Sequence, residues 1–132
     1  NIPTFVMMAP IIPGLNDHEI FELVKKVADL GAYSVGYTMV RLNGDVATLF
    51  ADWVEKTLPD RADKILNKIK DVHGGKLSDN RFGTRMSGEG HTSEIISKQF
   101  KLAKKKFMAD RPRVAYNLEM HDDFKNAQLK LF

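Results

Sequence analysis

The residues best suited to chemistry lie in a glycine-rich loop at positions 80–90, with the sequence NRFGTRMSGEG. Arg81 and Arg85 stand among three glycines shortly before a predicted helix, a pattern typical of an anion-binding cradle. An exposed Phe82 in this loop can stack on a nucleic-acid base. The alternative is an ordered loop whose arginines pair with nearby carboxylates such as Glu89, and the sequence leaves both interpretations open.

A second group of candidate residues lies where two predicted strands end. The apolar run of residues 5–9 predicts a parallel strand covered on both faces, and pairing should fail at Pro10, which cannot donate a ladder hydrogen bond. Ligands of α/β sheets and barrels bind beyond the carboxyl ends of the strands. Arg41 ends the second predicted strand and would either face this zone or pair with Asp45 or Asp17.

The sequence lacks the residues that several other kinds of catalytic or metal site require. It contains no cysteine, which excludes thiol nucleophiles, disulfides and cysteine-ligated zinc or iron–sulfur sites within it. The four histidines share no metal-binding spacing, so we expect no metal site. Walker loops, dinucleotide-binding glycine motifs and serine nucleophile elbows are also missing. The sequence by itself therefore assigns no catalytic residue.

The composition is that of a small globular protein. The 132 residues, 43% of them hydrophobic, suffice for one core but not for an eight-stranded barrel of about 250 residues. The net charge of +3 permits an acidic partner without requiring one. The sequence shows no apolar run of membrane-spanning length and no signal peptide. These features predict a cytoplasmic protein without a membrane partner.

Apolar periodicity predicts a strand–helix–strand unit followed by helices. Asn16 and Glu19 have the spacing of a capping box for a helix that Gly31 ends, and a second strand is predicted from Tyr33 to Leu42. With the first strand, these elements predict a right-handed parallel βαβ unit. The later segments are helices between Asp45 and Leu58, between Pro59 and Gly74, and from Thr92 to Phe107, a loop at 76–91, and a surface tail at 114–132.

The start of the chain suggests a piece of a larger protein. It begins at Asn1 without a methionine and almost inside a predicted strand, and a parallel strand needs a neighbour. We therefore expect a front part that the sequence does not include. The uncovered flank of the strand at residues 5–9 would favour self-association of the isolated chain.

Three motifs together resemble the C-terminal part of radical S-adenosylmethionine proteins, in the group related to spore photoproduct lyase and often labelled DNA repair photolyase. The motifs are MAPIIPGLNDHE at 8–19, Arg41-Leu42, and RFGTRMSGEG at 81–90. The resemblance implies an α/β fold in which the βαβ unit supplies the last two strands of a partial (β/α) barrel. The organisation would then be a single domain at 1–132, with the barrel end at 1–44, a helical subregion at 45–110 and a tail at 111–132.

The resemblance also implies cofactors that the chain does not bind alone. Such proteins hold a [4Fe–4S] cluster through a Cys-x-x-x-Cys-x-x-Cys loop and cleave S-adenosylmethionine, and this chain lacks that loop. Ala9, Pro10 and Ile11 match the strand end that approaches S-adenosylmethionine, and Arg41 matches an arginine at the end of the last strand. The implied function is the C-terminal part of a lyase-like enzyme acting on nucleic acid. The alternative is a non-enzymatic module that binds nucleic acid through Arg81, Phe82 and Arg85 or binds a protein partner.

The last five residues carry a separate signal. The sequence QLKLF resembles the pentapeptide that binds the bacterial sliding clamp, with Gln128, Leu129, Leu131 and Phe132 at the matching positions. The resemblance implies a sliding-clamp partner. The alternative is an amphipathic tail that folds onto the core of its own chain.

Overall fold

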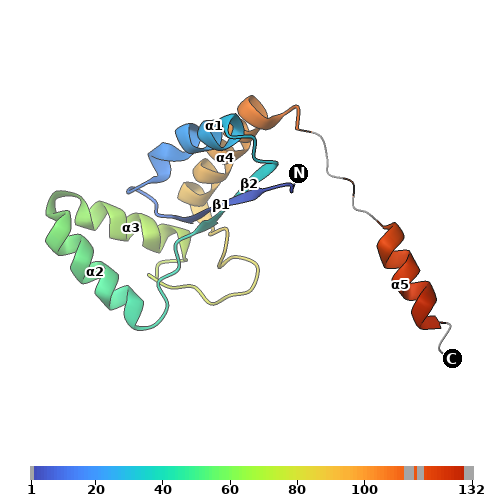
Figure 1. Cartoon of the computed structure of the whole chain (residues 1–132). Helices are drawn as coiled ribbons and strands as arrows, with labels where there is room; N and C mark the ends of the chain where they lie inside the picture. The colour runs from blue at the N-terminus through green and yellow to red at the C-terminus, as the bar shows by residue number, and fades with distance from the viewer. Residues whose placement is uncertain (1, 112–114, 116–117, 130–132) are drawn as a thin grey trace.

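The computed structural model describes residues 2–111, 115 and 118–129, the last four of these by their backbone alone. This part of the chain is a mixed α/β structure in which two parallel strands lie beside helices (Figure 1). The elements are the strands β1 (Phe5–Ile11) and β2 (Ser34–Met39), the helices α1 (Ile20–Asp29), α2 (Asp45–Thr57), α3 (Ala62–Val72), α4 (Gly90–Met108) and α5 (Glu119–Leu129), and the short 3-10 helices η1 (Asp17–Glu19) and η2 (Pro59–Arg61).

The strands β1 and β2 pair in parallel on either side of α1 in the sequence, as predicted. Phe5 lies opposite Ser34 and Met8 opposite Tyr37, and the register is then irregular up to Ile11. The irregular stretch contains the proline that cannot donate a ladder hydrogen bond, although the strand continues past it. A parallel two-stranded sheet is compatible with one end of a partial barrel, and the barrel itself stays a prediction.

The prediction that β1 is covered on both faces is wrong. Val6 and Met8 pack against the core, whereas Phe5 and Met7 are 55% and 52% exposed. The two exposed side chains lie over Gly36 of β2, where an added Cβ would be 2.8 Å from the Phe5 ring. The reason is that the core formed with α1 and α4 lies on one face of the strand, so the side chains from Phe5 to Met8 alternate between exposed and partly buried.

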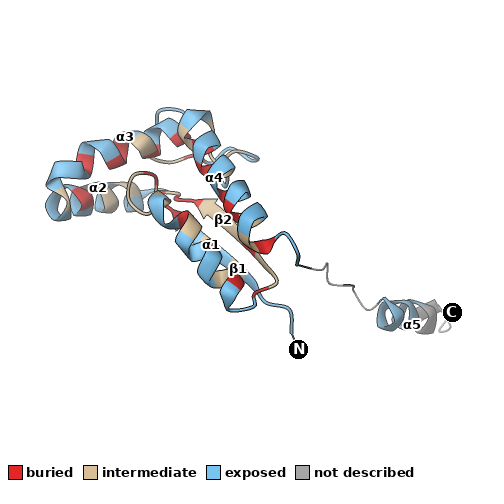
Figure 2. Cartoon of the chain, turned by 90° about the horizontal axis from the view of Figure 1, so that it is seen from above, coloured by how far each residue is buried: buried red, intermediate tan, exposed pale blue. Residues whose placement is uncertain are grey.

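Two apolar clusters lie on either side of the strand ends. The first joins the sheet to α1 and α4 through Val24, Val35, Ile96 and Phe100, with the rings of Tyr37 and Phe100 4.6 Å apart. The second joins the segment after β2 to α2 and α3, and its buried members are Val40, Leu42, Val54, Ala62, Ile65 and Ile69. Figure 2 shows the buried residues in red along one side of these helices. The carboxyl ends of the strands therefore lie between the two clusters.

The predicted capping role of Asn16 is wrong, because its side chain is used differently. Its Oδ1 accepts a hydrogen bond from the backbone N–H of Ile12 at 2.7 Å, and its Nδ2 donates to the carbonyl of Pro10 at 3.1 Å. No side-chain cap is present at either η1 or α1. Asn16 thus fixes the turn that leaves β1, while α1 begins at Ile20 and ends before Gly31, as the glycine predicts.

The helix α4 begins two residues earlier than the sequence predicts. α4 starts at Gly90, and Thr92 lies inside its first turn, where its backbone N–H donates to Asp71 Oδ2 at 3.3 Å. Further along α4, Lys104 Nζ donates to the carbonyl of Val35 at 2.9 Å. The helix is therefore attached to α3 at one end and to β2 near the other.

The tail contains a helix that the sequence did not predict. The backbone of residues 119–129 forms α5, drawn apart from the other helices in Figure 1. The described side chains of residues 118–125 are all exposed. Of the clamp-like pentapeptide, Gln128 and Leu129 have a helical backbone, whereas Leu131 and Phe132 lie outside the described residues, so the clamp prediction stays untested. Among the described residues, every helix falls short of the length and apolar character needed to cross a membrane.

Candidate functional site

Three segments that are far apart in the sequence meet at the carboxyl ends of the strands. The backbone N–H of Val40 donates to the carbonyl of Ile11 at 2.9 Å, which joins the ends of β1 and β2. One residue earlier, the N–H of Met39 donates to the carbonyl of Met86 at 2.9 Å, which joins the loop at 80–90 to the same edge. The motif after β1, Arg41 and the glycine-rich loop therefore form one region.

Arg41 follows directly after this junction. Its Nη1 lies 3.8 Å from Sδ of Met86, and its Nε is buried without a hydrogen-bond partner. The pairing considered from sequence does not occur within the described residues, where Asp17 instead lies 3.5 Å from Nζ of Lys68 and Asp45 forms no ion pair with Arg41. Among the described residues Arg41 thus has no carboxylate partner, and its guanidinium has the chemistry that recognises anions.

The residues predicted to approach S-adenosylmethionine differ in how far they are exposed to solvent. Ala9 and Pro10 are exposed and line an apolar groove of about 310 Å³ together with Leu23 and Val27 of α1. Ile11 is 2% exposed, and its carbonyl already accepts the hydrogen bond from Val40, the residue after β2. Ala9 and Pro10 therefore offer a surface to a ligand, whereas Ile11 serves mainly to hold the strand ends together.

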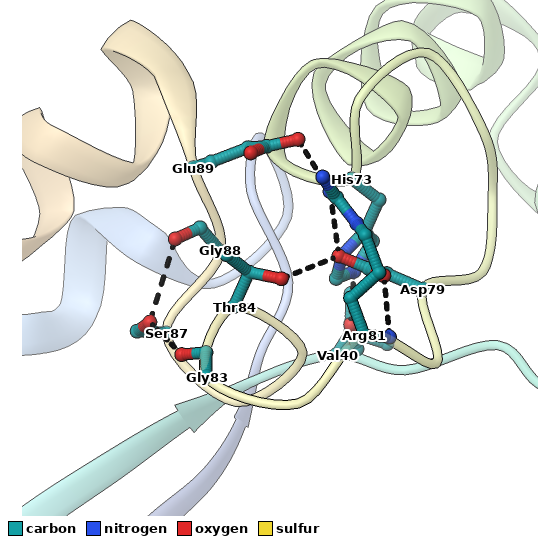
Figure 3. A network of polar contacts seen from close by, with 9 residues as sticks. All are labelled: Val40, His73, Asp79, Arg81, Gly83, Thr84, Ser87, Gly88 and Glu89. Atoms are coloured by element: carbon teal, nitrogen blue, oxygen red, sulfur yellow. Dashed lines mark hydrogen bonds and ion pairs between the residues drawn. The ribbon is translucent and has the colours of Figure 1, made fainter.

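The loop at 80–90 is held by a network centred on Asp79 (Figure 3). One carboxylate oxygen of Asp79 accepts hydrogen bonds from the backbone N–H of Arg81 at 2.9 Å and from its Nε at 3.0 Å. The other accepts from Arg81 Nη2 at 2.9 Å and from Thr84 Oγ1 at 3.0 Å. The Asp79 side chain is only 3% exposed. These bonds, first of all those from the Arg81 side chain, hold the pKa of Asp79 well below its ordinary value.

A second carboxylate completes the network. Nη2 of Arg81 also donates to Oε1 of Glu89 at 2.5 Å, and the two acids raise the pKa of the guanidinium above its ordinary range. Gly74 makes room for this pair, because a Cβ at that position would lie 2.7 Å from Glu89 Oε1. Of the two interpretations left open by the sequence, the geometry of Arg81 matches the ordered loop with local ion pairs.

Arg85 and Phe82 have a different environment. Phe82 is 92% exposed, and the guanidinium carbon of Arg85 lies 5.6 Å from the centre of its ring. Arg85 forms no ion pair with a carboxylate among the described residues, in contrast to Arg81. This pair presents a cation and an aromatic ring together, a combination that can stack on a base, and the predicted binding role stays a prediction.

His73 is a residue that our sequence analysis did not assign to this region. It is 2% exposed, its Nε2 lies 2.7 Å from the carbonyl of Val40, and its Nδ1 is buried without a partner. Since a carbonyl only accepts, Nε2 carries the proton in this contact. The signal was present in the sequence, because His73 follows Ile69 by four residues and so continues the apolar face of α3.

A pocket of about 680 Å³ lies beside this network. Its lining residues are His73, Gly74, Lys76, Ser78, Asp79, Asn80, Arg81 and Glu89. The two cations of this lining face two carboxylates, so the pocket has little net charge. It is therefore a poor candidate for a strong anion site.

The residues present do not fit an iron–sulfur cluster. The chain has no cysteine, and no three histidine, aspartate or glutamate side chains gather in the described part of the chain in a way that could hold a metal ion. Comparison of the chain with protein-family models, curated proteins and solved structures gives no match. The likeness to radical S-adenosylmethionine proteins therefore depends on the sequence motifs alone and stays a prediction.

Proposed function

We propose that this chain is the C-terminal part of a radical S-adenosylmethionine iron–sulfur enzyme that acts on nucleic acid in a lyase-like repair reaction. The observation that carries the proposal is the meeting of its three motifs. The two hydrogen bonds from Met39 and Val40 bring the segment after β1, Arg41 and the loop at 80–90 to one edge of a parallel sheet. This is the edge at which α/β folds bind ligands.

The exposed face of β1 supports the same proposal. Phe5 and Met7 place two large apolar side chains in solvent on a strand that pairs with β2 alone in the described chain. Exposed apolar strands are association sites that native proteins usually cover. In the proposed enzyme, the front strands of the barrel and their neighbours cover this surface and supply the cysteine loop.

In the proposed enzyme, the contribution of this chain is to bind and orient S-adenosylmethionine and the substrate. S-adenosylmethionine, when bound, supplies the radical chemistry in such enzymes. Ala9 and Pro10 would line its surface, and the guanidinium of Arg41, which has no carboxylate partner among the described residues, would bind an anionic group of the cofactor or substrate. No step can be assigned to the cluster from this chain, because its ligands are not among these residues.

The cofactor role of Arg41 is tested by equilibrium dialysis of radiolabelled S-adenosylmethionine against the protein encoded by the whole reading frame. Arg41→Ala should weaken binding by about tenfold, the order of one charge-assisted hydrogen bond. Arg41→Lys should recover only part of the loss, because lysine lacks the planar fork. Lys70→Ala, which removes a cation from the exposed side of α3, is the matched control. Equal affinities for all four proteins would contradict the assignment.

A second function is favoured by the pairing of Arg85 with the exposed ring of Phe82. In this alternative the chain is a non-enzymatic module that binds nucleic acid or a protein partner. It predicts oligonucleotide binding by the isolated chain that is weakened by Phe82→Ala and by Arg85→Ala. The amino-acid sequence that the whole reading frame encodes distinguishes the two functions, since only the enzyme requires the three-cysteine loop.

A further inference from the structure

A second pocket, of about 460 Å³, lies where the turn after β1 meets α3 and α4. Its lining residues are Gly14, Asp17, His18, Arg61, Lys64, Lys68 and Gln99. None of these was a candidate binding residue in the sequence, where Asp17 was considered only as a partner for Arg41. Because the turn, η2–α3 and α4 all contribute, residues from three separate parts of the chain form its walls.

The charges of this lining are unbalanced. Arg61 directs Nη2 to the backbone carbonyl of Gly14 at 2.6 Å, a contact that orients the guanidinium without neutralising it. Lys68 lies 3.5 Å from Asp17 Oδ2, a long ion pair with the one carboxylate of the lining. Lys64 is exposed and forms no ion pair with a carboxylate in the described part of the chain. Three cations therefore face one acid.

The position of these cations on α3 strengthens the effect. Arg61 is the N-cap of α3 and Lys64 lies in its first turn, where the helix dipole is positive. Cations at this end are unfavourable for the helix dipole, whereas Asp63 in the same turn is favourable. The adjoining face of the same helix buries Ile65 and Ile69. Arg61, Lys64 and Lys68 thus form one stripe along η2 and α3, at intervals of three and four residues, beside this buried face.

The close fit of the turn keeps this arrangement in place. Gly14 has φ +83°, and an added Cβ would lie 3.1 Å from Cδ of Lys68 and 3.6 Å from a side-chain carbon of Ile65. The stem of Lys68 therefore packs on the glycine while its charged end reaches the pocket. The segment from Arg61 to Lys68 extends for about 10 Å along the helix axis, at 1.5 Å a residue. This is about the rise of three nucleotides of one strand, at ~3.4 Å each.

We propose that this pocket binds the phosphate backbone of nucleic acid, with Arg61, Lys64 and Lys68 as the contacting residues. The inference rests on the nucleic-acid part of the proposed function and assigns the surface that holds the substrate backbone. The cations supply affinity without reading sequence, as phosphate contacts do. Arg85 and Phe82 in the loop at 80–90 would then contact bases.

The test is fluorescence anisotropy with a labelled oligonucleotide, single-stranded and as a duplex, added to the 132-residue chain at several salt concentrations. Lys64→Glu should weaken binding by at least about tenfold. It should also reduce the magnitude of the slope of log K against log salt by about one, as expected for the loss of one phosphate contact. Lys64→Gln should have a smaller effect in the same direction. The matched control is Lys70→Glu, the same charge reversal on an exposed position of α3 outside the pocket, which should keep the parent affinity. Circular dichroism confirms that each variant is folded.

Each other outcome decides against the pocket. Equal losses for Lys64→Glu and Lys70→Glu would indicate a general charge effect and overturn the inference. Loss of binding only in Phe82→Ala and Arg85→Ala would place the contact in the loop, overturning the pocket while leaving nucleic-acid binding intact. Displacement of the oligonucleotide by an equal concentration of inorganic phosphate would assign the site to free phosphate instead. The reading frame upstream of Asn1 tests the enzyme proposal independently of all these results.

Discussion

The guanidinium of Arg81 binds both carboxylate oxygens of Asp79, with Nε 3.0 Å from Oδ1 and Nη2 2.9 Å from Oδ2. The two residues are separated by one position in the sequence, so this fork closes a tight turn at the start of the loop. The same guanidinium then reaches Glu89 at the far end of the loop. One side chain thus holds both ends of the segment whose Met86 carbonyl joins the edge of β2.

Asp79→Asn should make the chain less stable near neutral pH and less sensitive to acid. The folded pKa of Asp79 lies below its ordinary value of 3.8, so the unfolded chain binds more protons over that interval. The stability that Asp79 contributes is therefore complete above pH of about 4 and is lost as the pH falls further. Denaturant titrations of both proteins at about pH 7 and down to about pH 2 measure this difference. If the free energies of unfolding of the parent and the variant differed by the same amount at every pH, the role of Asp79 would be contradicted.

His73→Phe should destabilise the chain by about 1–3 kcal/mol, because the buried Val40 carbonyl loses the donor that lies 2.7 Å away. His73→Gln keeps an N–H donor and should cost less. Urea titration at neutral pH gives both free energies of unfolding. If the phenylalanine variant were as stable as the parent, the hydrogen bond to the strand end would have no energetic importance.

Ile69→Ala should cost about 2–5 kcal/mol, because Ile69 is fully buried between α3 and the segment after β2. Leu49→Ala is the control, since Leu49 of α2 is 68% exposed and should change the free energy of unfolding by less than about 0.5 kcal/mol. Chemical denaturation measures both. Similar losses for the two variants would show that α2 and α3 pack differently from this structure.

The isolated chain should associate with a second copy through β1. Phe5 and Met7 are half-exposed on a strand with a free edge in the described sheet. Light scattering at high protein concentration should show a dimer or larger species, and Met7→Lys should shift it toward monomer because a charged edge opposes strand pairing. A clean monomer of the parent chain under these conditions would refute the prediction.

Local patterns predicted the helices of the body and the pairing of the strands. α1 and α3 have apolar residues at helical spacing, and Gly31 and Gly74 follow the ends of these helices with positive φ, as their sequences indicate. These features depend on neighbouring residues alone. The same reasoning identified Arg41 as a candidate, and its guanidinium does lie beside the loop at 80–90.

Features that depend on distant parts of the chain were not predictable in this way. The burial of β1 depends on which elements cover it, and its apolar run looked like a fully covered strand. The Lys68–Asp17 pair joins residues 51 positions apart, and Lys104 reaches Val35 across 69 positions. Asn16 could equally have capped a helix or closed a turn, and its choice depends on the Pro10 carbonyl that the bent chain presents. The basic pocket became visible only once the turn after β1 was placed against α3.

The most direct measurement of the central claim is the amino-acid sequence encoded in frame upstream of Asn1, together with the iron content of the whole product purified without oxygen. The proposal predicts a Cys-x-x-x-Cys-x-x-Cys loop after an early strand, with about four iron and four sulfide ions per chain, lost when the three cysteines are replaced. An upstream sequence without this loop, or a complete product free of iron and sulfide, would contradict the enzyme proposal.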